Sequence, residues 1–170
     1  MVCAAITLEL ARPQDALIIA QMSRDLIEAG LGWKYQTPTV LRAIAHADTL
    51  TVVARGRDGL AGFAMAHFDD ELAHLVLLAV QPSRQRRGIG RQLLQWLLTS
   101  ANTAGICDVE LELRAGNLAA LQFYNALGFR ETTRVAGYYR QQESAIRMRL
   151  VLREPGPAVS AWQAPTLRRS

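Results

Sequence analysis

Residues 81–91 carry the residue types that bind phosphate: two glycines and four arginines, between an apolar segment and a helical one. Gly88 and Gly90 allow the backbone to bend tightly, so that consecutive N–H groups can point at one anion. The helix that follows adds the positive end of its dipole. The guanidinium groups add formal charge and favour two-pronged phosphate contacts; they belong to Arg84, Arg86, Arg87 and Arg91. The segment therefore predicts a site for a pyrophosphate.

Two better-known phosphate loops are excluded by the residues around the second glycine. A P-loop ends in Gly-Lys followed by Ser or Thr, whereas Gly90 is followed by Arg91 and Gln92. A dinucleotide-binding fingerprint has a third glycine three residues on, where this chain has Leu93. A solvated basic loop with helix-capping glycines is the remaining alternative. The apolar segment before the loop and its arginines favour the phosphate site instead.

The composition is that of an ordinary globular chain with a mild basic excess. Half of the 170 residues are hydrophobic, and the formal net charge is +4 with a pI of about 9.6. That charge suits a phosphate-bearing ligand, and the long basic runs typical of nucleic-acid binders are missing. Cys3 and Cys107 are too few for a disulfide scaffold and match no zinc spacing. Since no signal peptide or membrane-length apolar stretch is present, we expect a cytoplasmic protein without a metal.

Hydrophobic periodicity and turn signals divide the chain into strands and helices. Expected helices cover 13–30, 37–47, 90–104 and the segment between Asn117 and Gly128; expected strands cover 6–10, 49–55, 60–68, 72–80, 109–115 and 144–152. This order predicts an α/β chain with an antiparallel front half and a crossover connection in its second half. We expect one domain over residues 1–153 and a Pro-rich tail over 154–170.

Two motifs, in this order, resemble the GNAT superfamily of acetyl-CoA-dependent N-acetyltransferases. Residues 85–90, Gln-Arg-Arg-Gly-Ile-Gly, are similar to its Q/R-x-x-G-x-G/A loop. Residues 111–129 resemble its segment ending in Y-x-x-L-G-F, and are most similar to the RimI-like branch, which acetylates the N-terminal amine of a ribosomal protein. The resemblance covers about residues 6–152. It implies a mixed, mostly antiparallel central sheet of about six or seven strands, flanked by about four helices.

The resemblance also implies acetyl-CoA as co-substrate and assigns residues to it. The loop amides are implied to hold the pyrophosphate, over Gln85, Arg86, Arg87, Gly88, Ile89, Gly90 and Arg91. The backbone of the preceding strand is implied to pair with the pantetheine arm as an extra strand would, at Leu78, Ala79 and Val80. Asn117 is implied to contact the coenzyme, and it is independently a good helix N-cap.

Acetyl transfer to an amine requires two proton transfers. The acceptor must lose a proton, since α-amino groups have a pKa of about 8 and lysines of about 10.4, and the departing thiolate must gain one. The resemblance implies Glu112 as the proton acceptor and Tyr124 as the proton donor. His74, at the start of the strand over 72–80, is an alternative base.

Purely structural roles remain open for both residues. Tyr124 can pack in the core with Phe123 and Phe129. Glu112 shares one face of an alternating strand with Glu110 and Arg114, and such a row can be an exposed ion-pair ladder of little energetic value.

The acceptor pocket is implied to lie between an early loop and a late one. The first carries Trp33 and Tyr35, and the second carries Tyr138 and Tyr139. Aromatic side chains on loops line recognition surfaces, and they also pack at the edges of cores. The acceptor can be a peptide or a small-molecule amine. We expect no nucleic-acid or membrane partner, and either a monomer or a homodimer.

The sequence thus predicts an N-acetyltransferase that works by direct transfer in a ternary complex. A non-catalytic acyl-CoA-binding or sensor module is the alternative, with Glu112 and Tyr124 as structural residues. A basic nucleic-acid or protein adaptor would place the arginines on a phosphate backbone. That function is disfavoured because the arginines cluster in one loop of ligand size.

Overall fold

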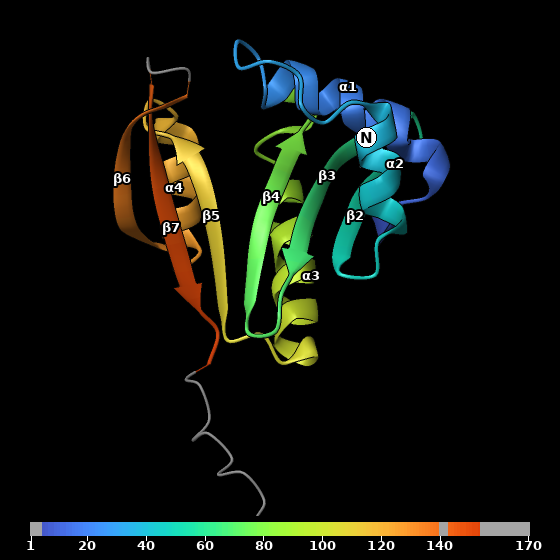
Figure 1. Cartoon of the computed structure of the whole chain (residues 1–170). Coiled ribbons are helices and arrows are strands. Elements are labelled where there is room, and N and C mark those ends of the chain that lie inside the picture. Colours follow the sequence, from blue (N-terminus) through green and yellow to red (C-terminus); the bar gives the residue numbers. More distant parts are fainter. Residues whose placement is uncertain (1–4, 140–142, 154–170) are drawn as a thin grey trace, which may run out of the picture.

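A seven-stranded mixed sheet, in the order β1-β2-β3-β4-β5-β7-β6, organises the chain (Figure 1). The computed structural model describes residues 5–139 and 143–153. The strands are β1 (Thr7–Leu10), β2 (Thr49–Gly56), β3 (Gly59–Phe68), β4 (Leu72–Val80), β5 (Asp108–Arg114), β6 (Arg130–Tyr139) and β7 (Glu143–Val151). The α-helices are α1 (Ala16–Leu26), α2 (Thr37–Ala45), α3 (Ile89–Ala104) and α4 (Leu118–Ala126), with short 3-10 turns at Pro13–Asp15 and Pro82–Arg84.

The sheet opens between β4 and β5, which are its parallel pair. They are paired from Leu72 with Asp108 to Leu75 with Leu111, and beyond that register the two strands diverge (Figure 1). The register between β3 and β4 shifts at the same level, which leaves Val76 as an extra residue in β4. A bulge of this kind bends a strand and increases its twist. The bend therefore follows directly after the last residue that β4 pairs with β5.

Helices cover the two faces of the sheet unequally. On one face, α1 and α2 pack against β2, β3 and β4, with Ile19, Val40 and Phe63 fully buried among them. On the other face, α3 and α4 pack across the sheet around Leu93 and Phe129. Both faces of β4 are therefore covered, as its nearly continuous apolar sequence indicates. Among the described residues, no helix covers the α1 side of β5, β7 and β6 (Figure 1).

The predicted fold class is confirmed: the sheet is mixed and mostly antiparallel, and four α-helices of the described residues flank it. Two local expectations were wrong. The backbone of Tyr138 and Tyr139 belongs to strand β6 rather than to a loop. The segment 130–134 is polar and exposed, so this edge strand gives no hydrophobic alternation to detect.

The first helix also ends earlier than expected, at Leu26 instead of Gly30. Its last turn closes when the N–H groups of Ile27 and Glu28 both donate to the carbonyl of Ser23, at 3.0 and 2.8 Å. The side chain of Glu28 then turns inward to accept the Ser23 hydroxyl at 3.0 Å. A buried carboxylate with local partners overrides the helical pattern here.

Within residues 5–139 and 143–153, no helix is long and apolar enough to cross a membrane. The expected Pro-rich tail, 154–170, lies outside the described residues.

Candidate active site

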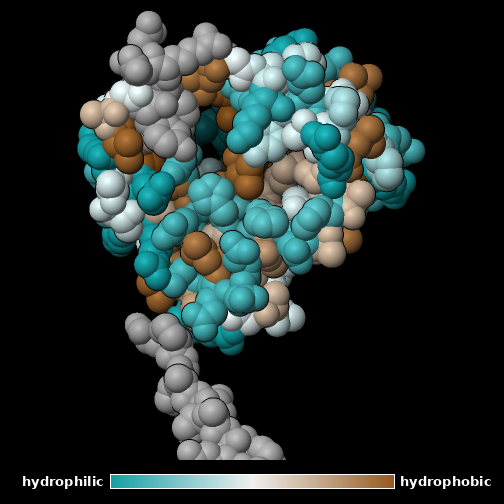
Figure 2. Space-filling model, in the orientation of Figure 1, coloured by the Kyte–Doolittle hydropathy of each residue, from teal (hydrophilic) through white to brown (hydrophobic). Residues whose placement is uncertain are grey.

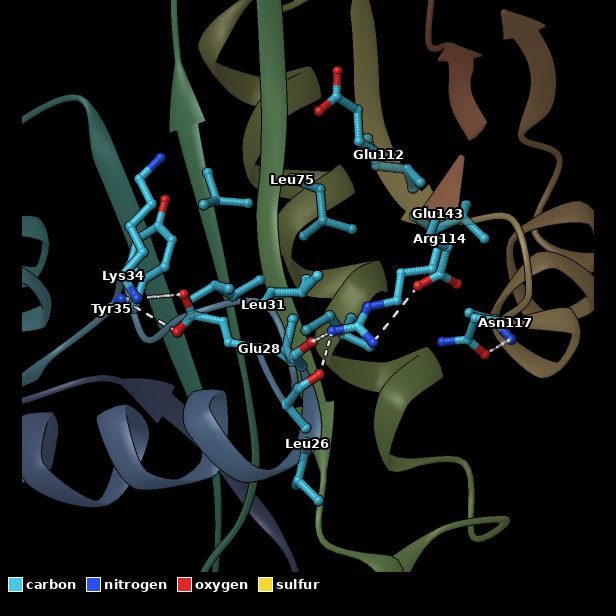
Figure 3. Close-up of a pocket in the computed structure, with 18 of the residues that line it drawn as sticks. Leu26, Glu28, Leu31, Lys34, Tyr35, Leu75, Glu112, Arg114, Asn117 and Glu143 are labelled. Atoms are coloured by element: carbon cyan, nitrogen blue, oxygen red, sulfur yellow. Dashed lines mark hydrogen bonds and ion pairs between the residues drawn. The ribbon is translucent and has the colours of Figure 1, made fainter. Parts of the chain in front are cut away.

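A cavity of about 840 Å³ lies where β4 and β5 diverge. The space-filling view shows the molecule hollowed on this side, between the α1 region and the strands β5 to β7 (Figure 2). Its wall is built from the middle of β4, the end of β5, the start of α4, the loop after α1 and the first residue of β7. The cavity thus brings together segments that are remote in sequence (Figure 3).

Glu112 lines this cavity from β5, with 17% of its side chain exposed. Its neighbour across the strand pair is Arg147 of β7. The guanidinium of Arg147 donates to Oε1 of Glu112 from Nη2 at 2.6 Å and from Nε at 3.1 Å. Two hydrogen bonds from the neighbouring strand β7 therefore hold Glu112.

Tyr124 lines the cavity from α4 and is buried. Its ring packs edge-on against Phe123 and Phe129, with centroids 5.1 and 5.5 Å away. Burial raises the pKa of the Tyr124 phenol well above its ordinary value of 10.0. The phenol therefore keeps its proton across the neutral range. The expected packing with both phenylalanines is present, and it is compatible with proton donation into the cavity.

The expected phosphate loop joins the end of β4 to α3. Gly88 is the N-cap of α3 and has a left-handed φ of 79°, and Arg86 also has a positive φ, of 60°. The first backbone bond of the helix runs from Gln92 N–H to the Gly88 carbonyl at 3.0 Å. The N–H groups of residues 89–91 consequently have no acceptor within the helix. This arrangement fits an anion such as a diphosphate.

Side chains around the loop reinforce that fit. Gln85 donates from Nε2 to the Val80 carbonyl at 3.0 Å, which folds the loop back on the end of β4. Arg84 is paired with Asp58 at 3.0 Å, whereas Arg86 and Arg87 are exposed. Ile89 is buried, so that its side chain anchors the start of α3 and its backbone faces the loop. Arg91 is exposed on the first turn of α3.

The β4 residues and Asn117 differ in their position around the cavity. Leu78 lines it, whereas Ala79 packs under α1 and α2 and Val80 packs on the α3 side. Asn117 also lines the cavity, and its Oδ1 accepts the N–H of Ala120 at 3.1 Å. The expected N-cap of α4 is therefore confirmed, and the contact of Asn117 with a coenzyme stays a prediction.

The residues that were expected to line the pocket for the acceptor amine do not all lie at the cavity. Tyr35 lines the cavity, and Trp33 does not belong to its lining. The Trp33 indole N–H instead donates to the carbonyls of Ala20 and Tyr35, at 3.2 and 3.1 Å. Trp33 therefore fixes the loop against α1. The backbone of Tyr138 and Tyr139 lies in β6, and their side chains lie outside the described part of the chain.

Several charged residues of the cavity wall were not predicted as site residues. Glu28 and Glu143 line it, and Arg114 reaches between their segments (Figure 3). Arg114 carried one detectable signal, its place on the same face of the alternating strand as Glu112. Glu28 gave none, because it lies inside an apolar helical pattern. His74, considered as an alternative base, also lines the cavity.

A comparison with known protein families assigns this fold to one of them. The chain belongs to the acetyltransferase (GNAT) family, which it matches over residues 20–129. It is 42% identical over 96 residues to the [ribosomal protein bS18]-alanine N-acetyltransferase of Salmonella typhimurium, covering 55% of this chain and 65% of that protein. The Escherichia coli enzyme of that name is 39% identical over 94 residues, 54% of this chain and 64% of that protein. These matches span just under two thirds of the relatives' length. They confirm the resemblance inferred from the two motifs.

Solved structures agree with this assignment. The Escherichia coli ribosomal-protein-S18-alanine N-acetyltransferase superposes with a TM-score of 0.76 and 28% identity, covering 91% of this chain and 99% of that one. Arabidopsis thaliana NAA60 in complex with acetyl-CoA gives a TM-score of 0.77 at 19% identity, covering 86% and 98%. The second likeness establishes the common fold.

Proposed function

We propose that this chain transfers an acetyl group from acetyl-CoA to a primary amine, directly and within a ternary complex. The observation that carries the proposal is the cavity between β4 and β5. Its wall includes a carboxylate, Glu112, and a buried protonated phenol, Tyr124. Membership of the GNAT family supports the same reaction.

The proposed coenzyme site uses the loop and the adjoining strand. The amides of Gly88 to Arg91 would hold the diphosphate, with Arg86 and Arg87 adding positive charge. The backbone of β4 from Leu78 to Val80 would pair with the pantetheine arm, because β4 has no partner in β5 beyond Leu75. Asn117 would contact the coenzyme from the start of α4. Bound there, acetyl-CoA supplies a thioester carbonyl open to attack.

The chain's own residues then carry the two proton transfers. Glu112 accepts the proton that the acceptor amine loses, directly or through one water. The amine nitrogen forms a bond to the carbonyl carbon, and the bond from carbon to sulfur breaks. Tyr124 protonates the departing thiolate, and its raised pKa keeps it in the donating form.

A protein N-terminus is the acceptor that we propose first. The relatives described above are named for acetylating an alanine of ribosomal protein bS18. An α-amine, with a pKa of about 8, also costs less to deprotonate at neutral pH than a lysine at about 10.4. A small-molecule amine is the second candidate. Cytoplasmic location, a monomeric or homodimeric state, and the lack of nucleic-acid or membrane partners remain predictions from the sequence.

A thiol-release assay tests the proposal against the acyl-CoA sensor alternative. The protein is mixed with acetyl-CoA and a panel of peptides with different first residues, lysine peptides and small amines. We expect thiol release that depends on at least one acceptor, and acetyl-CoA binding by calorimetry without any acceptor. Binding without turnover across the whole panel would support the sensor module and contradict the enzyme.

A further inference from the structure

Arg114, the last residue of β5, spans the open side of the cavity. Its Nη2 donates to the carbonyl of Ala29 at 2.6 Å and to that of Ile27 at 3.3 Å. These partners lie 85 and 87 positions earlier in the chain. Its Nη1 lies 3.8 Å from Oε2 of Glu143, at the start of β7. Figure 3 shows the guanidinium reaching from β5 toward the segment after α1.

The two carbonyls that Arg114 binds follow the C-terminus of α1. The last carbonyl groups of a helix accept no hydrogen bond from within it, and the helix dipole makes that end negative. A guanidinium there supplies hydrogen bonds and a complementary charge. Of the two, the Ile27 carbonyl belongs to the C-cap residue of α1 and the Ala29 carbonyl to the loop after it. Arg114 therefore ties the end of α1 and this loop to the opposite arm of the divided sheet, because α1 packs on β4 whereas Arg114 belongs to β5.

Glu28 fixes the other end of the same segment. This carboxylate is buried, with 9% of the residue exposed. Oε1 accepts the N–H of Lys34 at 2.7 Å, and Oε2 accepts the N–H of Tyr35 at 3.2 Å. Residues 27–35, here called the acceptor wall, are thus held by Glu28 from inside and by Arg114 from across the cavity (Figure 3).

We propose that Arg114 is a positioning residue that fixes the acceptor wall relative to β5, the strand that carries Glu112. This inference rests on the proposed acetyl transfer to an amine. Beyond Leu75 and Leu111, β4 and β5 share no register in the described residues, so their ladder does not set the distance between the arms. Arg114 joins the arms at that level. An amine held by the wall then meets Glu112 at a fixed separation, which direct transfer requires.

The fork shape of arginine is what this position needs. Arg114 serves two carbonyls with one nitrogen while another nitrogen faces a carboxylate. A lysine carries the same charge on a single nitrogen and cannot reproduce that geometry. The variant Arg114→Lys therefore separates the loss of the clamp from the loss of charge.

The experiment compares Arg114→Lys with Arg55→Lys. Arg55 also bridges separate elements, through Glu9 and Asp15, but it lies outside the cavity wall. For Arg114→Lys we expect the KM of the acceptor to rise about 10-fold or more, with kcat lowered and the Kd of acetyl-CoA unchanged. For Arg55→Lys we expect only a lower Tm. An unchanged acceptor KM in Arg114→Lys, or a parallel rise in the Kd of acetyl-CoA, would overturn the proposal.

Amide hydrogen exchange tests the clamp without reference to activity. We expect the amides of Leu31, Lys34 and Tyr35, which are bonded within the acceptor wall, to exchange at least about 10-fold faster in Arg114→Lys. Arg55→Lys should leave them unchanged. Equal exchange in all three proteins overturns the positioning role. If the wild-type protein transfers no acetyl group, the proposed function fails, and this exchange result still decides the clamp.

Discussion

Arg147 and Glu112 face each other on adjacent strands, and both hydrogen bonds from the guanidinium go to one carboxylate oxygen, Oε1. The fork fixes the orientation of the carboxylate at the cavity wall. It also gives a carboxylate with only 17% of its side chain exposed a cationic partner, which a group withdrawn from water needs. Glu112 is thus both the anionic partner of Arg147 and the proposed base.

Replacing Glu112 with Gln should lower kcat by about 100-fold or more, because a positioned base contributes roughly that factor. The Kd of acetyl-CoA should stay the same. Glu110→Gln is the matched control, since Glu110 shares the strand face but does not belong to the cavity lining. Steady-state kinetics of the two variants provide the comparison. Equal effects of the two changes would remove Glu112 from the proposed chemistry.

Replacing Tyr124 with Phe should lower kcat by about 10-fold to 100-fold, with coenzyme binding retained. The change removes one hydroxyl and keeps the packing with Phe123 and Phe129. Steady-state kinetics and calorimetry measure both quantities.

The pH profile of the wild-type rate is a second test of Tyr124. Because the pKa of Tyr124 is raised, its donating form persists as pH rises, and the rate should increase with pH as the amine deprotonates, without a fall up to about pH 10. A fall between neutral pH and about pH 9 would exclude Tyr124 as the acid.

The double change Arg86→Gln and Arg87→Gln should raise the Kd of acetyl-CoA by about 30-fold, since each of the two lost phosphate contacts costs on the order of 1 kcal/mol. Binding of acetyl-pantetheine, which lacks the diphosphate, should not change. Arg84→Gln should have a smaller effect, because Arg84 is already paired with Asp58. Calorimetric titration of both ligands distinguishes these cases. An equal loss for acetyl-pantetheine would place the arginines away from the phosphates.

Replacing Glu28 with Gln should destabilise the protein by about 1–3 kcal/mol, because an amide nitrogen cannot accept the hydrogen bonds that one carboxylate oxygen accepts now. The acceptor KM should rise with the loss of order in the acceptor wall. Ser23→Ala is the control, since it removes one hydroxyl donor and leaves the N–H groups of Lys34 and Tyr35 bonded. Thermal unfolding and kinetics measure both effects. A stable Glu28→Gln protein with normal KM would show that Glu28 does not order the wall.

The order and type of most elements could be predicted from the sequence, because local patterns determine them. The apolar run of β4, the alternation of β5 and the cap at Asn117 each depend on near neighbours. Strand β6 could not be predicted, since an exposed edge strand such as 130–134 is stabilised by its partner and not by its own apolar face.

The site divides along the same line. The motifs that predict roles for Glu112, Tyr124 and the loop around Gly88 occupy continuous segments. The partners of the cavity residues come from elsewhere in the chain. Glu112 is held by Arg147, and Arg114 is held by the carbonyls after α1. Such contacts exist only once the sheet is assembled. The position of Trp33 outside the cavity lining also depends on a contact remote in sequence, because its partner Ala20 lies on α1.

Mass spectrometry of a single turnover tests the central claim most directly. The protein is loaded with one equivalent of acetyl-CoA and mixed with a peptide that begins with alanine. We predict that the acetyl group appears on the α-amine of the peptide, with free coenzyme A formed in equal amount and no acetylated protein at any time. Acetyl groups on the protein before the peptide, or coenzyme A formed without acetylated peptide, would contradict direct transfer in the cavity between β4 and β5.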